Sequence, residues 1–120
     1  MTTREIGNIG ERAVCWYLRF RGYRILDRNY TIKGGEIDIV AYKRKILHFV
    51  EVKTRKENSL TTGEEAITKA KQFHIIKTAR RYCATQHKRF EGVVFDVAVV
   101  THKNNKVSDI VYYKDAFRVR

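Results

Sequence analysis

Apolar residues recur every three or four positions over two stretches of the chain, and this spacing predicts two amphipathic helices. The first is expected from Thr3 to Arg21, just before Gly22, because glycine is favoured immediately after a helix. The second is expected from Glu64 to about Gln86. The apolar face of the first helix should comprise Ile6, Ile9, Ala13, Val14, Trp16, Tyr17, Leu18 and Phe20, with Cys15 on the polar side. That of the second should comprise Ile67, Ala70, Phe73, Ile76, Ala79 and Cys83. We expect Trp16 and Phe20 to lie in the core.

Shorter apolar stretches bounded by turn-forming residues predict five β-strands. The strands are expected at Tyr23–Asn29, Glu36–Tyr42, Ile46–Lys53, Gly92–Thr101 and Ser108–Tyr113. The turns are expected at Gly34-Gly35, Lys43–Lys45 and Asn104-Asn105, with a loop at Asn58–Gly63. The second helix lies between the third and fourth strands, which permits a parallel crossover. The expected fold is therefore α/β, with a mixed five-stranded sheet flanked by helices.

The length and composition favour one cytoplasmic domain. The chain has 120 residues and no proline, and we find no low-complexity linker, so a single domain over residues 1–120 is expected. No apolar run approaches the roughly 18 residues of a membrane span. The first residues form a charged amphipathic segment, which is unlike the apolar core of a signal peptide.

The charge balance favours a polyanionic partner. Lys and Arg number 25 against 13 Asp and Glu, a net charge of +12, and nucleic acid is the polyanion expected first. A basic surface that only confers solubility is the alternative. Lys43–Lys45 is too short a basic run for a membrane-binding segment. The two cysteines and four histidines have no metal-ligand spacing, which argues against a zinc site.

Charged residues stand inside two of the predicted apolar strands. Glu51 and Lys53 are two positions apart and so share one face of the third strand, while Asp38 lies in the second strand. If the two strands form a hairpin with the acidic faces aligned, the Cβ atoms of Asp38 and Glu51 come within about 4.5–8 Å. Two carboxylates so close repel each other unless a proton or a cation intervenes. Oxygen ligands of this kind suit Mg²⁺ or Mn²⁺, so the pattern indicates a metal-dependent nuclease site.

A structural interpretation of the same residues remains open. Glu51 and Lys53 would form an internal ion pair, and Asp38 would end its strand in a hydrogen-bonded turn. The spacing of Glu51 and Lys53 alone does not decide between the two, because such a pair arises easily by chance. The additional acid on the preceding strand and the basic net charge favour the nuclease site.

Asp38 together with Glu51-Val52-Lys53 resembles the signature of the restriction-endonuclease-like superfamily, PD-(D/E)xK, with Ile37 in place of the proline. A closer resemblance, over most of the chain, is to the YraN-like family of small bacterial proteins. That resemblance is carried by Gly10-Glu11, Gly22-Tyr23, Arg28-Asn29, Gly35–Asp38 and Phe49–Arg55. The organisation is also similar to archaeal Holliday-junction resolvases, which place a glutamate on the first helix. The resemblance implies a restriction-endonuclease-like αβββαβ core, a divalent metal and a nucleic-acid substrate.

Several further residues are candidates for the site. Glu11 and Glu36 compete to complete the metal site. The alternative is an ordinary solvated glutamate for Glu11 and a charge at the strand start, beside the Gly34-Gly35 turn, for Glu36. Arg55, Lys69 and Lys71 are candidate contacts to nucleic acid. The alternative is a plain polar role at the strand end for Arg55 and a solvated helix face for the two lysines. Asp96 stands inside an apolar strand, so we expect a structural hydrogen bond or ion pair there rather than metal ligation. Tyr112, Tyr113 and Phe117 are expected to pack the last strand rather than stack on bases.

The first functional hypothesis is a Mg²⁺- or Mn²⁺-dependent endonuclease that hydrolyses phosphodiester bonds in DNA, with branched or damaged DNA as the expected substrate. Asp38 and Glu51 would bind the metal, and Lys53 would act on the attacking water. A non-catalytic nucleic-acid-binding module is the second hypothesis, and a protein-interaction domain is the third. A homodimer would let two sites cut both strands, although no residue requires one.

Overall fold

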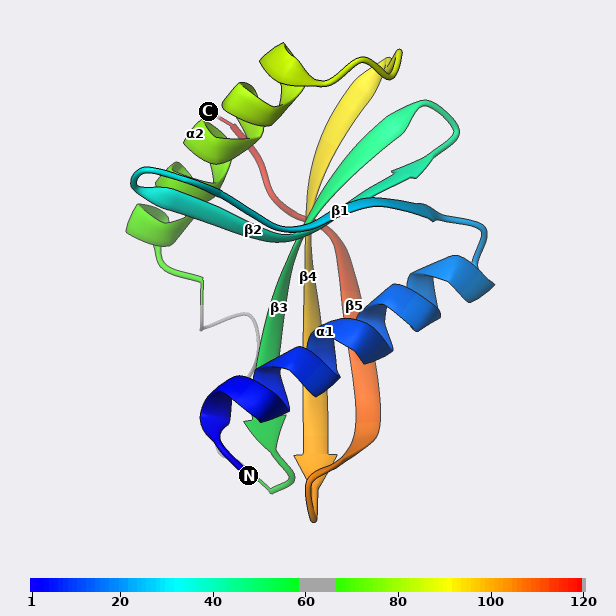
Figure 1. Cartoon of the computed structure of the whole chain (residues 1–120), viewed down its shortest axis with the longest axis vertical. Helices are drawn as coiled ribbons and strands as arrows, with labels where there is room; N and C mark the ends of the chain where they lie inside the picture. Colours follow the sequence, from blue (N-terminus) through cyan, green and yellow to red (C-terminus); the bar gives the residue numbers. More distant parts are fainter. Residues whose placement is uncertain (59–66, 120) are drawn as a thin grey trace.

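The computed structural model describes residues 1–58 and 67–119 and contains a five-stranded sheet with two helices (Figure 1). In chain order the elements are α1 (Thr3–Phe20), β1 (Arg24–Ile32), β2 (Gly35–Lys43), β3 (Ile46–Lys56), α2 (Lys69–Thr85), β4 (Gly92–Lys103) and β5 (Lys106–Phe117). The strands lie side by side in the order β1-β2-β3-β4-β5. Only β3 and β4 pair in parallel. The predicted element order and mixed sheet are confirmed.

Both ends of α1 are specified by local sequence. Thr2 is the N-cap, and its side chain and that of Glu5 exchange hydrogen bonds with each other's backbone N–H groups. Gly22 follows the helix with a φ of +87°, in the left-handed region that glycine adopts without a steric penalty. The N–H of Tyr23 then donates to the carbonyl of Leu18 at 3.0 Å. This is the Schellman arrangement, and the predicted role of Gly22 is confirmed.

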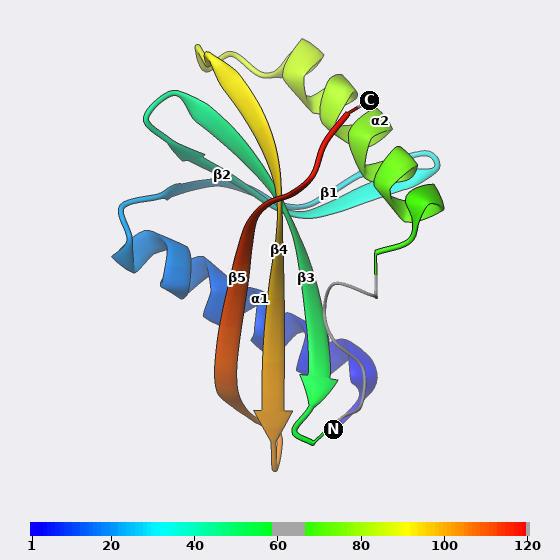
Figure 2. The same ribbon diagram turned by 180° about the vertical axis from the view of Figure 1, so that it is seen from behind.

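Each helix covers a different face of the sheet, as the two opposite views show (Figures 1 and 2). The core beneath α1 contains Val14, Cys15, Leu18, Tyr23, Ile39, Ala41, Val50, Ala98 and Val100. The core beneath α2 contains Ile37, Val40, Leu47, Phe49, Ile75, Ala79, Tyr82 and Phe95. Of the described helices, neither is long and apolar enough to cross a membrane.

The predicted helix faces are partly wrong. Trp16 is 53% exposed and Phe20 is 84% exposed, whereas Cys15 is 1% exposed. On α2, Phe73 is 64% exposed. The orientation of α1 follows close packing rather than summed hydrophobicity. Gly10 faces the sheet, where a Cβ atom would lie 2.6 Å from the Thr54 side chain.

The start of α2 also differs from the prediction. Thr68 is the N-cap, with extended backbone angles, and its side chain accepts a hydrogen bond from the N–H of Lys71 at 3.1 Å. The helix therefore begins at Lys69, and Ile67 is not helical. Residues 59–66 lie outside the described residues, and they hold most of the loop expected at Asn58–Gly63 and the helix start expected at Glu64.

β2 and β3 part before they end. Their register is antiparallel from Lys43 opposite Ile46 to Ile39 opposite Val50, and the pairing stops there. Beyond this point the β1–β2 turn and the end of β3 run in different directions (Figures 1 and 2). Meanwhile β3 continues in parallel register with β4 as far as Lys56. The divergence opens one end of the sheet beside α2.

A close approach of α2 to β2 borders this open end. Gly35 lies against α2 so tightly that an added Cβ atom would sit 1.9 Å from Thr78 Oγ1 and 3.2 Å from the His74 carbonyl oxygen. Thr78 is fully buried, and its hydroxyl donates to the same carbonyl at 2.7 Å. Only glycine at position 35 allows this packing.

Replacing Gly35 with alanine is therefore expected to destabilise the fold by about 1–3 kcal/mol, because α2 must retreat from β2. Chemical denaturation at equilibrium measures the loss. Gly7→Ala is the matched control, since a Cβ atom there would meet nothing within 4 Å and alanine favours a helix. Thr78→Ala should recover part of the loss, because it removes the closest clash. A Gly35→Ala protein as stable as the wild type would contradict this packing argument.

Candidate functional site

Asp38 and Glu51 are the first residues past the last paired positions of β2 and β3. One further step of the register that places Ile39 opposite Val50 would place Asp38 opposite Glu51, and both residues line the same pocket. Both side chains are nearly buried, at 8% and 7% exposure. The structure therefore brings these two predicted carboxylates together where the strands diverge.

The divergence also explains how the Asp38 carboxylate is held. Its Oδ2 accepts a hydrogen bond from the backbone N–H of Val52 at 2.8 Å, so a carboxylate oxygen takes the place of a strand partner. Burial and the neighbouring Glu51 carboxylate, with smaller effects from Glu11 and Glu36, raise the pKa of Asp38 to about 8. The bond from Val52 opposes this shift only in part. At neutral pH without a bound cation, the protonated form of Asp38 is therefore favoured.

Lys71 of α2 is the counter-ion of Glu51. Its Nζ lies 2.9 Å from Glu51 Oε1. Burial acts to lower the pKa of Lys71, but the hydrogen bond and charge of Glu51, together with Lys53 and Asp38, outweigh burial and the net pKa is raised. The Lys71 ammonium group therefore occupies the position beside Glu51 that a bound metal ion would take.

Lys53 lies next to this ion pair on β3. Burial lowers the pKa of Lys53, and the adjacent Lys71 ammonium lowers it further, against the attraction of Glu51 and Asp38. Among the ion pairs of the described residues, the partner of Glu51 is Lys71 and not Lys53. A lysine with a lowered pKa beside two carboxylates is suited to positioning or exchanging a proton.

Glu11 approaches the same region from α1. Its Oε1 lies 3.6 Å from a guanidinium nitrogen of Arg28, and burial raises the pKa of Glu11. The Oε1 atom is buried and has no hydrogen-bond partner among the residues that the structure describes. Glu36 is exposed on β2, where its charge contributes to the raised pKa of Asp38. Whether Glu11 or Glu36 completes a metal site stays a prediction.

A pocket of about 590 Å³ opens beside the acid pair. Its lining includes Asp38, Glu51, Glu36, Lys71 and His74, together with the β1–β2 turn. At that turn, Lys77 Nζ would lie 3.9 Å from a Cβ atom built on Gly34. Lys71 in the lining and Lys77 at the turn thus bring positive charge beside an acidic centre, which is an arrangement that attracts an anion and a cation together.

The donor set fits a hard divalent cation. Asp38 and Glu51 supply two carboxylates, and Mg²⁺ commonly binds one or two carboxylates and keeps several waters. The Glu11 Oε1 atom, which is ion-paired with Arg28 but accepts no hydrogen bond within the described residues, is a further acceptor. In the described part of the chain, no group of three histidine, cysteine or carboxylate side chains is close enough to form a metal cage. A site built on this pair would thus be open to water and substrate.

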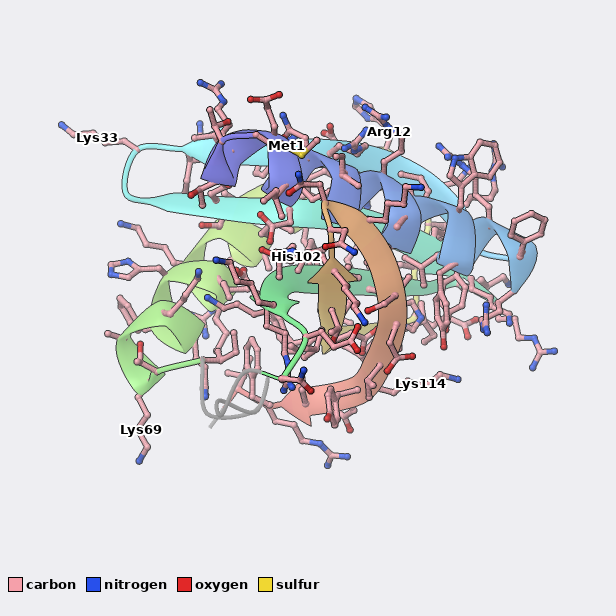
Figure 3. All side chains as sticks on the ribbon, turned by 90° about the horizontal axis from the view of Figure 1, so that it is seen from below. Met1, Arg12, Lys33, Lys69, His102 and Lys114 are labelled. Carbon is pink, nitrogen blue, oxygen red and sulfur yellow. The ribbon has the colours of Figure 1, made fainter. Side chains whose placement is uncertain are left out.

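The other predicted contacts lie in different surroundings. Arg55 lies half-buried on β3. Lys69 projects away from the sheet at the start of α2 (Figure 3). Lys71 instead faces the acid pair.

Asp96 belongs to a separate buried network. It is fully buried, and its carboxylate lies 2.8 Å from His48 Nδ1 and accepts hydrogen bonds from the Tyr112 hydroxyl at 2.5 Å and the Asp115 N–H at 2.9 Å. The expected structural role of Asp96 is confirmed. Phe117 stacks on Phe95 at 5.1 Å, as expected for packing of the last strand.

The role of Lys71 was the feature that sequence reasoning missed. The buried positions of α2 include Ile75, Thr78 and Tyr82, which follow Lys71 by four, seven and eleven residues. That spacing is the helical repeat of one face, and it predicts that Lys71 points to the sheet. The expected apolar face includes Phe73, which is exposed, and this rotates the predicted face away from Lys71.

Lys71→Met is expected to destabilise the metal-free protein by about 1–3 kcal/mol, because the buried Glu51 carboxylate loses its partner. Mg²⁺ should then stabilise this variant more than it stabilises the wild type, since no ammonium competes for Glu51. Thermal unfolding with EDTA and with Mg²⁺ measures both effects. Lys69→Met, two positions away and exposed, is the control. An equal response of the three proteins to Mg²⁺ would argue against competition at Glu51.

The five-stranded mixed sheet with a helix on each face defines an α/β protein compatible with a compact nuclease-like core. The model of "Uncharacterised protein family UPF0102" matches residues 10–100, and the chain belongs to this family. The chain is 38% identical over 118 residues to a UPF0102 protein of Dictyoglomus thermophilum, covering 98% of this chain and 100% of the relative. It is 40% identical over 116 residues to one of Alkaliphilus metalliredigens, covering 96% and 99%. The resemblance to the YraN-like family is confirmed.

Proposed function

We propose that this protein is a Mg²⁺- or Mn²⁺-dependent endonuclease that hydrolyses phosphodiester bonds in DNA, with branched or damaged DNA as its substrate. One observation carries the proposal: Asp38 and Glu51 meet, nearly buried, where β2 and β3 part, with Lys53 on the same strand as Glu51. Membership of the restriction-endonuclease-like superfamily is part of this proposal.

Asp38 and Glu51 are the residues that would hold the cation, which when bound would polarise the scissile phosphate and lower the pKa of a bound water. Lys53 would orient the attacking water and stabilise negative charge that develops on the phosphate. Asp38 must first lose its proton, because its pKa in the absence of a cation is about 8. Lys71 would move from Glu51 to the phosphate, and Glu11 or Glu36 would complete the set of acids.

The charge of the chain supports a nucleic-acid substrate. The net charge of +12 favours polyanions, and Lys71 lines the pocket that contains the acid pair. Lys71 and, more distantly, Lys69 and Arg55 are the proposed phosphate contacts. A homodimer acting in the cytoplasm on both strands of DNA fits this proposal.

The ion pair between Lys71 and Glu51 favours a second candidate, a nucleic-acid-binding module without catalysis. With Nζ at 2.9 Å from the carboxylate, Glu51 is neutralised without any metal. Such a module would bind DNA in a salt-sensitive manner and cut none under any divalent cation. The two candidates thus differ in one measurable property, the cleavage of DNA in the presence of a divalent cation.

The test is cleavage of labelled four-way junction, single-stranded and duplex DNA with Mg²⁺, Mn²⁺ or EDTA. Lys53→Met is expected to lower the cleavage rate about 10²- to 10⁴-fold while leaving DNA affinity nearly unchanged. Lys56→Met is the control, because Lys56 is an exposed lysine on the same strand. Binding without metal-dependent cleavage by the wild type would favour the non-catalytic module. Equal cleavage by all three preparations would indicate a contaminating nuclease.

A further inference from the structure

Two large aromatic side chains stand exposed on the outer surface of α1. Phe20 is 84% exposed and Trp16 is 53% exposed. They are one helical turn apart, and their ring centroids lie 6.1 Å from each other. The opposite side of the helix, with Val14 and Leu18, is buried against the sheet. We call Trp16 and Phe20 the aromatic pair.

The aromatic pair is surrounded by arginines. The guanidinium carbon of Arg19 lies over the Trp16 ring, 5.1 Å from its centroid. Arg12 is one turn before Trp16 and projects away from the sheet (Figure 3). Exposed aromatic rings beside cationic side chains are the two parts of a surface that binds single-stranded nucleic acid.

The acids of α1 do not neutralise this surface. Glu5 is held at the other end of the helix in the hydrogen bonds with Thr2. Glu11 faces the sheet and Arg28. The outer side of the second half of α1 therefore presents Trp16 and Phe20 with Arg12 and Arg19 and with no carboxylate of the helix.

We propose that the aromatic pair stacks with unpaired bases while the neighbouring arginines bind phosphate, so that α1 selects substrates with a single-stranded segment. This inference deepens the proposed function and rests on it for the identity of the substrate. Every base has a face on which an aromatic ring can stack, whereas in an intact duplex those faces are covered. Branched and damaged DNA expose such bases.

Charge distinguishes this partner from a second copy of the chain. An exposed Trp and Phe are also typical of protein interfaces. A symmetric contact through this helix, however, would bring the Arg12 and Arg19 side chains of two chains together, each chain carrying a net charge of +12. A polyanion removes that repulsion, and a second copy increases it.

The test uses the fluorescence of Trp16, which is the only tryptophan in the chain. The intact protein is titrated with an oligothymidylate in EDTA, so that no cleavage takes place. We expect saturable quenching, weaker with duplex DNA of the same length. Phe20→Ala should weaken binding about five- to 150-fold, the range found when a base-stacking ring is removed. Phe73→Ala, which removes a phenylalanine of 64% exposure from α2, should not weaken it.

Three outcomes of the titration would overturn the inference. Binding with unchanged Trp16 fluorescence would place the strand elsewhere, and binding unaffected by Phe20→Ala would exclude stacking on the pair. Fluorescence that depends on protein concentration alone, with a dimer in sedimentation, would assign the surface to self-association. The result is independent of the proposed chemistry. Quenching without metal-dependent cleavage would support the stacking surface and contradict the nuclease. Cleavage without quenching would support the nuclease and contradict the stacking surface.

Discussion

Glu51→Gln is expected to lower DNA cleavage by about 10³-fold or more, because the variant loses a metal ligand but keeps the size of the side chain. Glu51 is 7% exposed and lines the same pocket as Asp38, and Asp38 alone does not replace the lost ligand. DNA binding should survive, since neutralising an acid does not weaken attraction to phosphate. Initial rates with Mg²⁺ and binding measured in EDTA separate the two properties.

Glu57→Gln is the matched control for this variant. Glu57 follows β3 six residues after Glu51, and its side chain is 38% exposed and lies 4.0 Å from Lys103. Its loss should leave cleavage within about twofold of the wild type, because exposed ion pairs contribute little. Similar activity in the Glu51→Gln and wild-type proteins would remove Glu51 from the chemistry.

Asp38→Asn is expected to change how stability depends on pH. Burial raises the pKa of Asp38 from 3.8 to about 8, so the folded protein holds a proton that the unfolded chain releases. This contribution is complete below about pH 4 and is lost as the pH rises through about 8, at up to about 1.4 kcal/mol per pH unit. Asparagine resembles the protonated acid and does not titrate, so the variant should gain stability relative to the wild type between these limits.

Urea unfolding in EDTA between about pH 5 and 9 measures this difference. The exposed Asp109 of β5 supplies the control, since Asp109→Asn should leave the pH dependence unchanged. A pH dependence in Asp38→Asn that is parallel to that of the wild type would contradict a raised pKa at Asp38. Added Mg²⁺ should reduce the wild-type loss at high pH, because a cation takes the place of the proton.

Strand periodicity predicted much of the candidate site. Alternation along β2 and β3 placed Asp38 on one face of its strand and Glu51 with Lys53 on one face of theirs. The short turn at residues 43–45 limited the hairpin to few registers, and the observed register ends with Ile39 opposite Val50, one step before Asp38 and Glu51. Local pattern and turn length are sufficient to predict the strand faces and the hairpin register, because both depend on residues close together in the sequence.

Helix orientation could not be obtained in the same way. A hydrophobic arc gives the direction of a helix face only to within about one residue, or 100° of rotation. The orientation of α1 depends on Gly10 meeting Thr54, a contact between residues distant in sequence. This rotation exposes Trp16 and Phe20, and a similar shift in α2 turns Lys71 toward Glu51. The errors in the predicted core and the missed ion pair therefore have one physical cause.

The divergence of β2 from β3 had no signal in the sequence pattern. In both strands, apolar and charged residues continue to alternate past Ile39 and Val50, where pairing ends. The opening arises from the twist of the sheet and from Gly35, which lets α2 approach β2 closely. It is this opening that gives the acid pair a pocket.

The central claim is that Asp38 and Glu51 together bind one divalent cation. Calorimetric titration of the metal-free protein with Mn²⁺ at about pH 8.5, where Asp38 is mostly deprotonated, tests it most directly. We predict saturable binding of one Mn²⁺ to the wild type and to Glu57→Gln, at least about tenfold weaker binding to Glu51→Gln, and release of protons on binding. No binding to the wild type at millimolar Mn²⁺, or equal binding to all three proteins, would contradict the claim.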